Sequence, residues 1–98
     1  MTVILLQSAL DDFLEATDYF DGISNDLGLR FRQCVEKTIE SIVDFPEASA
    51  VVRKGYRVRT IVRFKKYGVL YRIRDGAIFI HGIFYLARGP RFWRSRLQ

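Results

Sequence analysis

Apolar residues recur at helical spacing in the first half of the chain and alternate with polar residues in much of the second half. A short apolar run at residues 2–6 predicts a strand. It is followed by a stripe of Leu10, Phe13, Leu14, Thr17 and Phe20. This three- and four-residue spacing is typical of an amphipathic helix, which Ser8 can cap and Gly22 can close. The acids of this segment are expected elsewhere around the helix: Asp11, Asp12, Glu15 and Asp18.

A second, longer helix is predicted directly after the first. Ser24, Asn25 and Asp26 are residue types that cap helices. Pro46 cannot continue a helix, so the helix should end near Phe45. The expected apolar stripe consists of Leu27, Phe31, Cys34, Val35, Thr38, Ile39, Ile42 and Val43. Two helices joined by a few residues should form an antiparallel hairpin.

From Tyr56 onward the pattern changes to a period of two, which is the period of β-strands. Residues 56–64 alternate between an apolar set and an arginine-rich set, which predicts a half-buried strand with a basic outer face. Lys65 and Lys66 form the expected turn, and residues 67–74 alternate again as the next strand.

A tight hairpin turn is predicted at Asp75-Gly76, because both central positions of such a turn need positive φ. Residues 77–86 are apolar at both parities, which predicts an interior strand, and the closing residues 88–98 are basic. The order is therefore strand, helix, helix and three antiparallel strands. We predict a two-layer α+β fold with the helical hairpin packed on one face of the sheet.

Composition limits the kinds of protein that this chain can be. It has 98 residues, 49% hydrophobic and 28% charged, so we expect one folded domain over residues 1–98. The single cysteine, Cys34, excludes an internal disulfide, and one distant histidine does not complete a metal site. We predict no cofactor. The absence of a recognisable signal peptide or membrane span predicts a cytoplasmic protein with no membrane partner.

The formal net charge of +5 conceals a strong asymmetry between the two halves of the chain. Residues 1–50 hold ten acids and three bases, a charge of −7, whereas residues 51–98 hold thirteen bases and one acid, a charge of +12. In the predicted fold this becomes an acidic helical layer and a basic sheet and tail. A basic surface usually faces nucleic acid, an acidic protein or a membrane surface.

Several motifs carry a resemblance to a known family. They are Ala9-Leu10-Asp11-Asp12 with Tyr19, Leu27-Gly28 with Phe31, Phe45-Pro46, Gly55 and Arg57, Tyr67-Gly68-Val69-Leu70-Tyr71-Arg72-Ile73, Ile83-Phe84-Tyr85, and Arg88, Pro90 and Trp93-Arg94-Ser95-Arg96. In this order they resemble toxins of the RelE/ParE superfamily from bacterial type II toxin–antitoxin systems, closest to the ParE-like plasmid stabilisation branch. The chain departs from the family pattern at Tyr85, where histidine is common, at Gly89, where aspartate is common, and at Lys65-Lys66, where a single proline is usual.

The resemblance implies one of two activities. Relatives of the RelE branch are ribosome-dependent endoribonucleases, whereas relatives of the ParE branch inhibit DNA gyrase by binding it. Metal-free RNA cleavage needs a proton acceptor, cations that stabilise the phosphorane and a proton donor. The candidate cations are Arg57, Arg59, Arg63, Arg72 and Arg88, and the candidate proton-transfer groups are Tyr85 and His81.

Each candidate also has a purely structural interpretation. His81 lies mid-strand between apolar neighbours, which is more typical of a packing residue than of a general base. Tyr85 could equally pack with its hydroxyl at the surface, and the strand arginines could form a solvated face. Trp93, a candidate binding residue with these arginines, is better explained as a clasp for the tail than as a stacking platform for bases.

The small number of acid–base groups favours a ParE-like gyrase inhibitor over an enzyme. The first alternative is a RelE-like endoribonuclease acting on the ribosome and mRNA through Arg88, Tyr85 and His81, and the second is a degenerate, non-toxic binding module. The expected partner is a cognate antitoxin, whose carboxy-terminal segment folds onto the toxin to form a hetero-oligomer. Its apolar contacts are expected among Phe13, Tyr19, Phe20 and Phe84.

Overall fold

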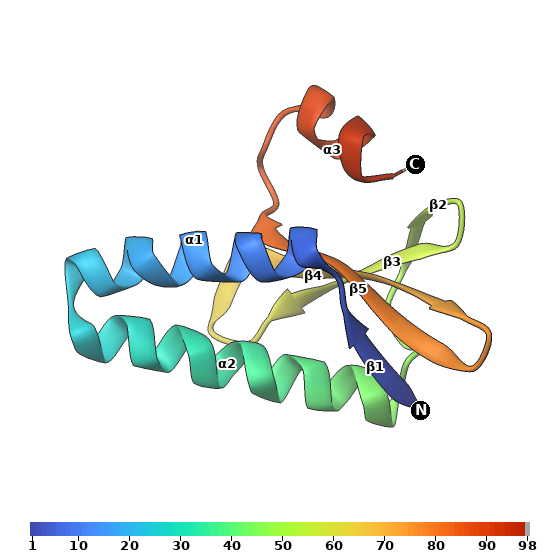
Figure 1. Cartoon of the computed structure of the whole chain (residues 1–98), viewed down its shortest axis with the longest axis horizontal. Helices are drawn as coiled ribbons and strands as arrows, with labels where there is room; N and C mark the ends of the chain where they lie inside the picture. The colour runs from blue at the N-terminus through green and yellow to red at the C-terminus, as the bar shows by residue number, and fades with distance from the viewer. Residues whose placement is uncertain (98) are drawn as a thin grey trace.

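Two long helices cover one face of a five-stranded sheet, and a short third helix packs against the other face (Figure 1). The structure is a computed structural model and describes residues 1–97. Its elements are β1 (Thr2–Leu5), α1 (Gln7–Ile23), α2 (Asn25–Asp44), β2 (Val51–Arg53), β3 (Tyr56–Ile61), β4 (Phe64–Arg74), β5 (Ala77–Tyr85) and α3 (Pro90–Arg96). The predicted α+β class and helical hairpin are confirmed. The sequence pattern did not reveal β2 and α3, because elements this short show no clear period.

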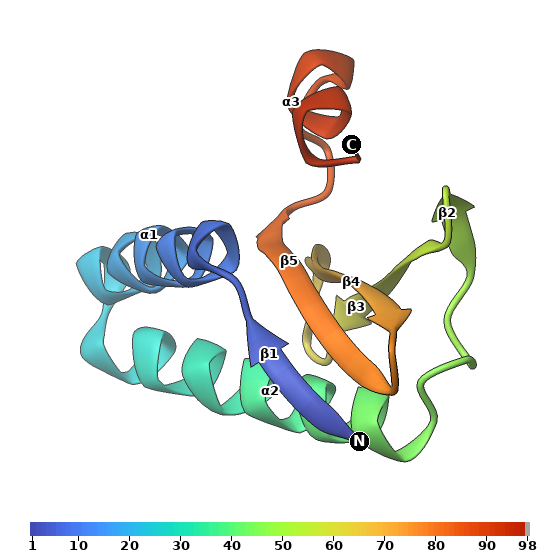
Figure 2. The same cartoon turned by 45° about the vertical axis from the view of Figure 1, so that its right-hand side comes forward.

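The sheet has the strand order β1-β5-β4-β3-β2. β1 runs parallel to β5, from Thr2 opposite Ala77 to Leu5 opposite Ile80, whereas the other neighbouring pairs are antiparallel. The start of the chain therefore lies beside its last strand (Figure 2). Because β1 is an edge strand, one side of its backbone has no strand partner within residues 1–97.

Three predicted boundaries are confirmed. The amide of Leu27 donates to the hydroxyl of Ser24 at 3.0 Å, so Ser24 caps α2, which ends shortly before Pro46. Asp75 and Gly76 connect β4 to β5 with φ values of 52° and 75°. Both residues thus adopt the left-handed conformation that a tight hairpin turn requires.

Two expectations about α1 are wrong. Ser8 does not cap the helix, which begins one residue earlier, and its hydroxyl instead donates to the carbonyl oxygen of His81 at 2.8 Å. Asp12 was expected away from the buried stripe but is only 7% exposed. It lies one turn from both Ala9 and Ala16, which are buried against the sheet. A carboxylate therefore occupies the core-facing side of α1.

The turn between β3 and β4 lies earlier than predicted. It is formed by Val62 and Arg63, and Arg63 has a φ of 66°. Lys65 and Lys66, the predicted turn, belong to β4. Ile61 pairs with Phe64 across this turn, which reverses the parity, but the register then shifts so that Thr60 pairs with Gly68. The shift restores the parity, so the period-two pattern continues beyond the turn.

β5 contains a bulge at His81. Leu70 pairs with Gly82 and Tyr71 pairs with Ile80, so His81 has no partner on β4. Beyond a bulge the side chains change face. Those in the core under the long helices are Ile78, Ile80 and Ile83, whereas Phe84 lies in the core on the other side. This shift, together with cover on both faces, explains why residues 77–86 are apolar at both parities.

Apolar side chains form two cores, one on each face of the sheet. The larger lies under α1 and α2 and includes Phe20, Phe31, Ile42, Tyr71 and Ile80. In the smaller, Phe92, Trp93 and Leu97 pack against Tyr56, Leu70 and Phe84. Phe20 and Phe84 were expected as exposed contacts for a partner, but both are buried, whereas Tyr19 is 61% exposed. Within residues 1–97 no helix has the length and apolar character needed to cross a membrane.

Candidate functional site

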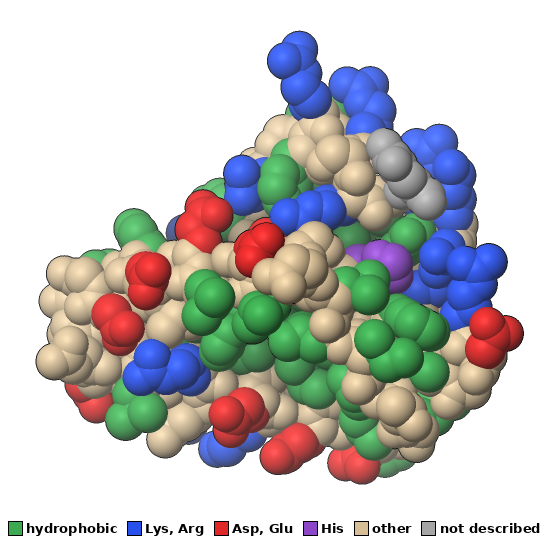
Figure 3. All heavy atoms as spheres, in the orientation of Figure 1, with side chains coloured by type: hydrophobic (Ala, Val, Ile, Leu, Met, Phe, Trp, Pro, Cys, Tyr) green, Lys and Arg blue, Asp and Glu red, His purple; other side chains and the backbone are tan. Residues whose placement is uncertain are grey.

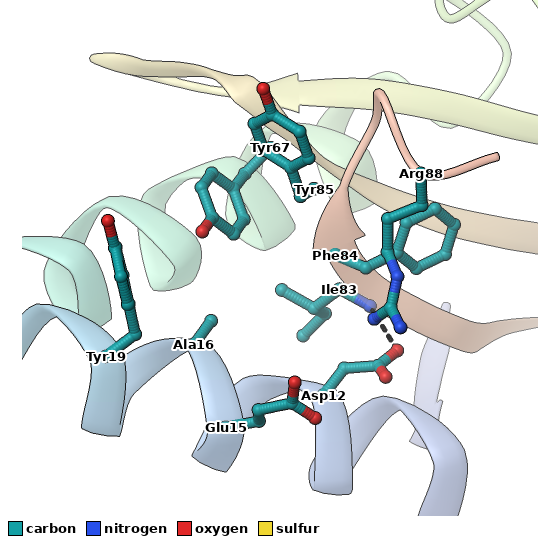
Figure 4. Close-up of a pocket in the computed structure, with 9 residues that line it drawn as sticks. All are labelled: Asp12, Glu15, Ala16, Tyr19, Tyr67, Ile83, Phe84, Tyr85 and Arg88. Atoms are coloured by element: carbon teal, nitrogen blue, oxygen red, sulfur yellow. Dashed lines mark hydrogen bonds between the residues drawn. The ribbon is translucent and has the colours of Figure 1, made fainter. Parts of the chain in front are cut away.

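Three tyrosines from α1, β4 and β5 meet at one end of the sheet. Tyr67 and Tyr85 face each other on paired strands, with ring centres 5.5 Å apart in an edge-to-face arrangement. Tyr19 approaches from α1 (Figure 4). The three side chains line a pocket of about 140 Å³, whose other walls are Asp12, Glu15, Ala16, Ile83, Phe84 and Arg88. We call it the tyrosine pocket.

The pKa of the Tyr67 phenol is raised above its ordinary value of 10.0. Burial is the main cause, followed by the neighbouring Tyr19, Tyr85 and Glu15. A raised pKa keeps the hydroxyl protonated at neutral pH. Tyr67 can therefore donate a hydrogen bond in this pocket but is a poor candidate for a general base.

The same three tyrosines also line a larger pocket of about 710 Å³ beside the β3–β4 turn. Its other walls are Phe20, Phe64, Arg63, Lys65 and Lys66. The three cations are exposed, whereas the two phenylalanines are largely covered. We call this the basic pocket. The sequence pattern does not reveal the basic pocket, because it predicts a turn at Lys65 and Lys66.

His81 lies on the other face of the sheet from Tyr85, on the side covered by α3. Its ring meets the Tyr56 ring edge to face, with centres 4.8 Å apart. Burial, with a smaller contribution from the nearby Arg72, lowers its pKa below the ordinary 6.5. His81 is therefore neutral at pH 7 and packs against an aromatic ring, as its structural interpretation predicts. The bulge separates it from Tyr85, because it reverses the parity of the strand.

Arg57 and Arg59 point toward the helical side and hold the loop that follows α2, so the expected basic outer face of this strand is wrong. Arg57 donates to the carbonyl oxygens of Glu47 and Ser49 at 3.1 and 2.7 Å. Arg59 donates to three oxygens at 2.6, 3.1 and 2.6 Å, namely Ser49 Oγ, Ser41 Oγ and Phe45 O. Alternation shows which residues share a face, but not which face meets the helices.

Arg72 and Arg88 both lie against aromatic rings. The Arg72 guanidinium is 4.4 Å from the centre of the Tyr56 ring, and its Nε is buried without a hydrogen-bond partner among residues 1–97. Arg88 is exposed beside the tyrosine pocket, and its guanidinium lies 3.8 Å from the centre of the Phe92 ring. Of the five candidate arginines, Arg63 and Arg88 thus line the pockets that the tyrosines form.

Trp93 fastens α3 to the end of β5. Its indole nitrogen donates to the carbonyl oxygen of Leu86 at 3.2 Å, and its ring packs edge to face against Phe84 at 5.1 Å. These contacts fit the interpretation of Trp93 as a clasp for the tail. Its candidate role in binding a partner stays a prediction.

A buried ion pair joins α1 to α3, and sequence reasoning missed it. Arg96 binds both carboxylate oxygens of Asp12, which also accepts from the backbone amide of Ile83 at 3.1 Å. Figure 4 shows this carboxylate at the edge of the tyrosine pocket. The one available signal was the position of Asp12 between Ala9 and Ala16 on the helix, because a carboxylate on a buried stripe needs a partner.

The charge asymmetry of the chain reappears on its surface. On the face that Figure 3 shows, carboxylates are spread over the two long helices, and lysines and arginines gather over α3 and the neighbouring part of the sheet. This agrees with the predicted acidic helical layer and basic sheet and tail. Among residues 1–97 no three histidine, cysteine or acidic side chains cluster in a way that could hold a metal ion.

Comparison with known proteins identifies the family. Residues 3–88 match the family described as ParE toxin of type II toxin-antitoxin system, parDE. A comparison with curated proteins finds no match. Among solved structures, the fold is similar to a chain from the chromosomal ParDE TA system from P. aeruginosa, with a TM-score of 0.76 and 17% sequence identity, covering 88% of this chain and 96% of that chain. Because the family match spans nearly the whole fold described above, the chain belongs to the ParE family of type II toxins.

Proposed function

We propose that this toxin acts in the cytoplasm by binding DNA gyrase and inhibiting it, the activity that its resemblance to the ParE branch implies. The main support is the separation of its candidate proton-transfer groups. Tyr85 lines the tyrosine pocket, whereas His81 packs against Tyr56 on the opposite face. Metal-free RNA cleavage needs a proton acceptor and a proton donor at one phosphate. Two groups on opposite faces of a sheet cannot serve the same phosphate.

Two arginines that already form hydrogen bonds within the fold add to this support. Arg57 and Arg59 already donate to oxygens of the loop after α2. Moving either to a phosphate would break two or three charged hydrogen bonds that hold this loop, which costs free energy. Two of the five candidate cations for a reacting phosphate are therefore committed to the fold.

RNA cleavage at the ribosome remains the second candidate, because Tyr85 and Arg88 line one pocket. A tyrosine hydroxyl beside an arginine could transfer a proton and stabilise a developing charge. In this candidate the groups act without His81. A non-toxic binding module is the third candidate.

We place the antitoxin contact at the open edge of β1. Its side chains Val3, Ile4 and Leu5 are 36%, 36% and 45% exposed, so they form a continuous exposed apolar run. An extended segment can add a strand at such an edge through backbone hydrogen bonds, with apolar side chains providing specificity. The family membership supports an antitoxin as the partner that covers this edge.

Induction of the chain in bacteria without its antitoxin separates the three candidates. The gyrase proposal predicts growth arrest with DNA damage and defective plasmid supercoiling, while mRNA stays intact. It also predicts that the purified protein inhibits supercoiling by gyrase. Codon-positioned cuts in mRNA would establish the ribonuclease instead, and normal growth with full expression would favour the non-toxic module.

A further inference from the structure

A third pocket adjoins the basic pocket on the other side of the β3–β4 turn. It has a volume of about 420 Å³ and is lined by Leu27, Arg30, Gln33, Cys34, Lys37, Arg63 and Phe64. Arg63 and Phe64 line both pockets, so the turn stands between two hollows that share a wall. We call the two pockets together the turn groove.

The turn groove is lined by five cations and by no acid: Arg30 and Lys37 from α2, Arg63 from the turn, and Lys65 and Lys66 from β4. Within residues 1–97, Arg30 alone among these five forms an ion pair, with Asp26 at 2.8 Å. That pair is exposed, so it is weak. Within residues 1–97 the other four cations have no carboxylate in an ion pair with them, so the groove concentrates positive charge and attracts a polyanion.

Five aromatic side chains line the basic-pocket half of the groove, and we call them its aromatic floor. Phe20 is buried, Phe64 and Tyr67 are half-buried, and Tyr19 and Tyr85 are 61% and 40% exposed. The rings of Tyr19 and Tyr85 thus present open surface, while Arg63, Lys65 and Lys66 are exposed at the rim. The groove combines a cationic rim with an aromatic floor.

Arg63 has a left-handed backbone conformation in the β3–β4 turn, as Lys54 and Asp75 have in theirs. Its φ of 66° lies in the left-handed region, where a residue with a Cβ is strained and glycine is not. Strain of this kind is common at binding and catalytic sites. A glycine at position 63 would suit the turn better, yet the turn presents a guanidinium to both pockets.

We propose that the turn groove binds single-stranded nucleic acid, with phosphates on the cations of the rim and bases against the exposed tyrosine rings. Each nucleotide of a single strand carries one charge on its backbone and one planar ring to the side, which matches a cationic rim above an aromatic floor. An acidic peptide would also satisfy the cations, but its carboxylates bring no planar rings to Tyr19 and Tyr85. The inference does not depend on the gyrase proposal, because it is tested without gyrase.

The direct test measures fluorescence anisotropy of labelled oligothymidylate and oligouridylate of about eight nucleotides, a length within the range of known single-strand sites. Binding of either strand should weaken with salt, by a slope of about −0.7 in log K against log[salt] for each phosphate contacted. A preference for oligouridylate would assign RNA as the ligand. Equal binding of the two strands would show that the groove recognises backbone charge and base rings and does not distinguish RNA from DNA.

Two matched glycine substitutions distinguish binding in the turn groove from general attraction of an anion to a basic protein. Arg63→Gly and Lys54→Gly each remove one positive charge from a left-handed residue, since Lys54 has a φ of 51° in the turn between β2 and β3. Arg63→Gly should weaken binding by about fivefold and reduce the salt slope, whereas Lys54→Gly should change neither. Both variants should fold at least as stably as the parent chain, because glycine relieves the backbone.

Tyr19→Ala tests the aromatic floor separately from the charge. It should weaken oligonucleotide binding without changing the salt slope, because it removes stacking and no cation. The proposal is overturned if Arg63→Gly and Lys54→Gly weaken binding equally. It is also overturned if neither oligonucleotide binds at low salt while a labelled oligoglutamate peptide does, which would assign the groove to an acidic protein.

Discussion

Asp12 of α1 and Arg96 of α3 form a two-point ion pair across 84 positions of sequence, with N–O distances of 2.5 and 2.6 Å. Their side chains are only 6% and 18% exposed. The hydrogen bond to Asp12 raises the pKa of Arg96 above its already high ordinary value. Because Asp12 also accepts from the amide of Ile83, one carboxylate connects α1 to both β5 and α3.

Arg96→Ala should lower the free energy of unfolding by about 3 kcal/mol, because it leaves the Asp12 carboxylate buried without its counter-charge. Urea denaturation measures this change. Arg94→Ala removes an exposed arginine from the same helix and should change stability by less than about 0.5 kcal/mol. Equal effects of the two substitutions on the free energy of unfolding would show that the ion pair stabilises the fold no more than any exposed arginine of α3 does.

Arg59→Ala should destabilise the loop between α2 and β2 by about 2 kcal/mol, because three oxygens lose a charged donor. Faster amide hydrogen exchange in residues 45–50 would localise the effect. Arg59→Lys should restore little, since one ammonium cannot reproduce the planar set of donors. Unchanged exchange in this loop in Arg59→Ala would contradict the structural role.

His81 should make stability depend on pH between neutral and mildly acid conditions. Its folded pKa lies below the ordinary 6.5, so below about pH 6.5 the unfolded chain binds a proton that the folded chain does not. The contribution of neutral His81 to the free energy of unfolding is therefore fully present above this pH. It is lost as the pH falls toward the lowered pKa, by at most about 1.4 kcal/mol per pH unit.

Urea denaturation midpoints at about pH 7.5 and about pH 5.5 measure this dependence. Both conditions lie above the ordinary pKa values of carboxylates, so Asp and Glu stay ionised. His81→Phe keeps a ring against Tyr56 but cannot titrate, so its midpoint should change less between the two conditions. His81 is the only histidine of the chain, which makes the comparison specific. Identical pH dependence in parent and variant would assign the effect to other groups.

Tyr85→Phe should retain growth arrest and gyrase inhibition within about twofold, whereas a ribonuclease that uses this hydroxyl should lose about a hundredfold or more of its activity. The substitution keeps the aromatic ring that faces Tyr67 and removes only the proton-transfer group. Growth and supercoiling assays on this variant decide between a gyrase inhibitor and a ribonuclease. Abolished toxicity with unchanged antitoxin binding would support the ribonuclease.

Ile4→Lys should weaken antitoxin binding by about tenfold, because a charge at the open edge of β1 opposes the addition of an apolar strand. Leu29→Lys is a matched control, since Leu29 is 46% exposed but lies on α2. Rescue of growth by a titrated level of antitoxin measures the difference. Rescue of Ile4→Lys at the same antitoxin level as Leu29→Lys would place the antitoxin elsewhere.

The sequence alone predicted the elements that local chemistry defines. Ser24 caps α2, Pro46 stops it, and Asp75-Gly76 forms a tight turn, because each depends on residues next to one another in the chain. The order of the motifs then placed the chain in its superfamily. The division into an acidic helical layer and a basic sheet and tail follows from the charges of the two halves.

The candidate site was only partly predictable, because alternation does not reveal where a strand turns or bulges. The two-residue turn at Val62-Arg63 reverses the parity of the pattern and the register shift beside it restores that parity, so the pattern alone predicts a later turn, at Lys65 and Lys66. The bulge at His81 reverses parity within β5 and separates His81 from Tyr85. Both features are visible only when two strands are paired.

The sequence by itself determined the class of fold, the helix boundaries, the family resemblance and the total charge, since these depend on neighbouring residues or on composition. Only the tertiary structure decided which face each side chain joins. It committed Arg57 and Arg59 to the loop after α2, paired Asp12 with Arg96, and gathered Tyr19, Tyr67 and Tyr85 at one end of the sheet. Contacts between distant segments form only when packing brings the segments together, and no local period records them.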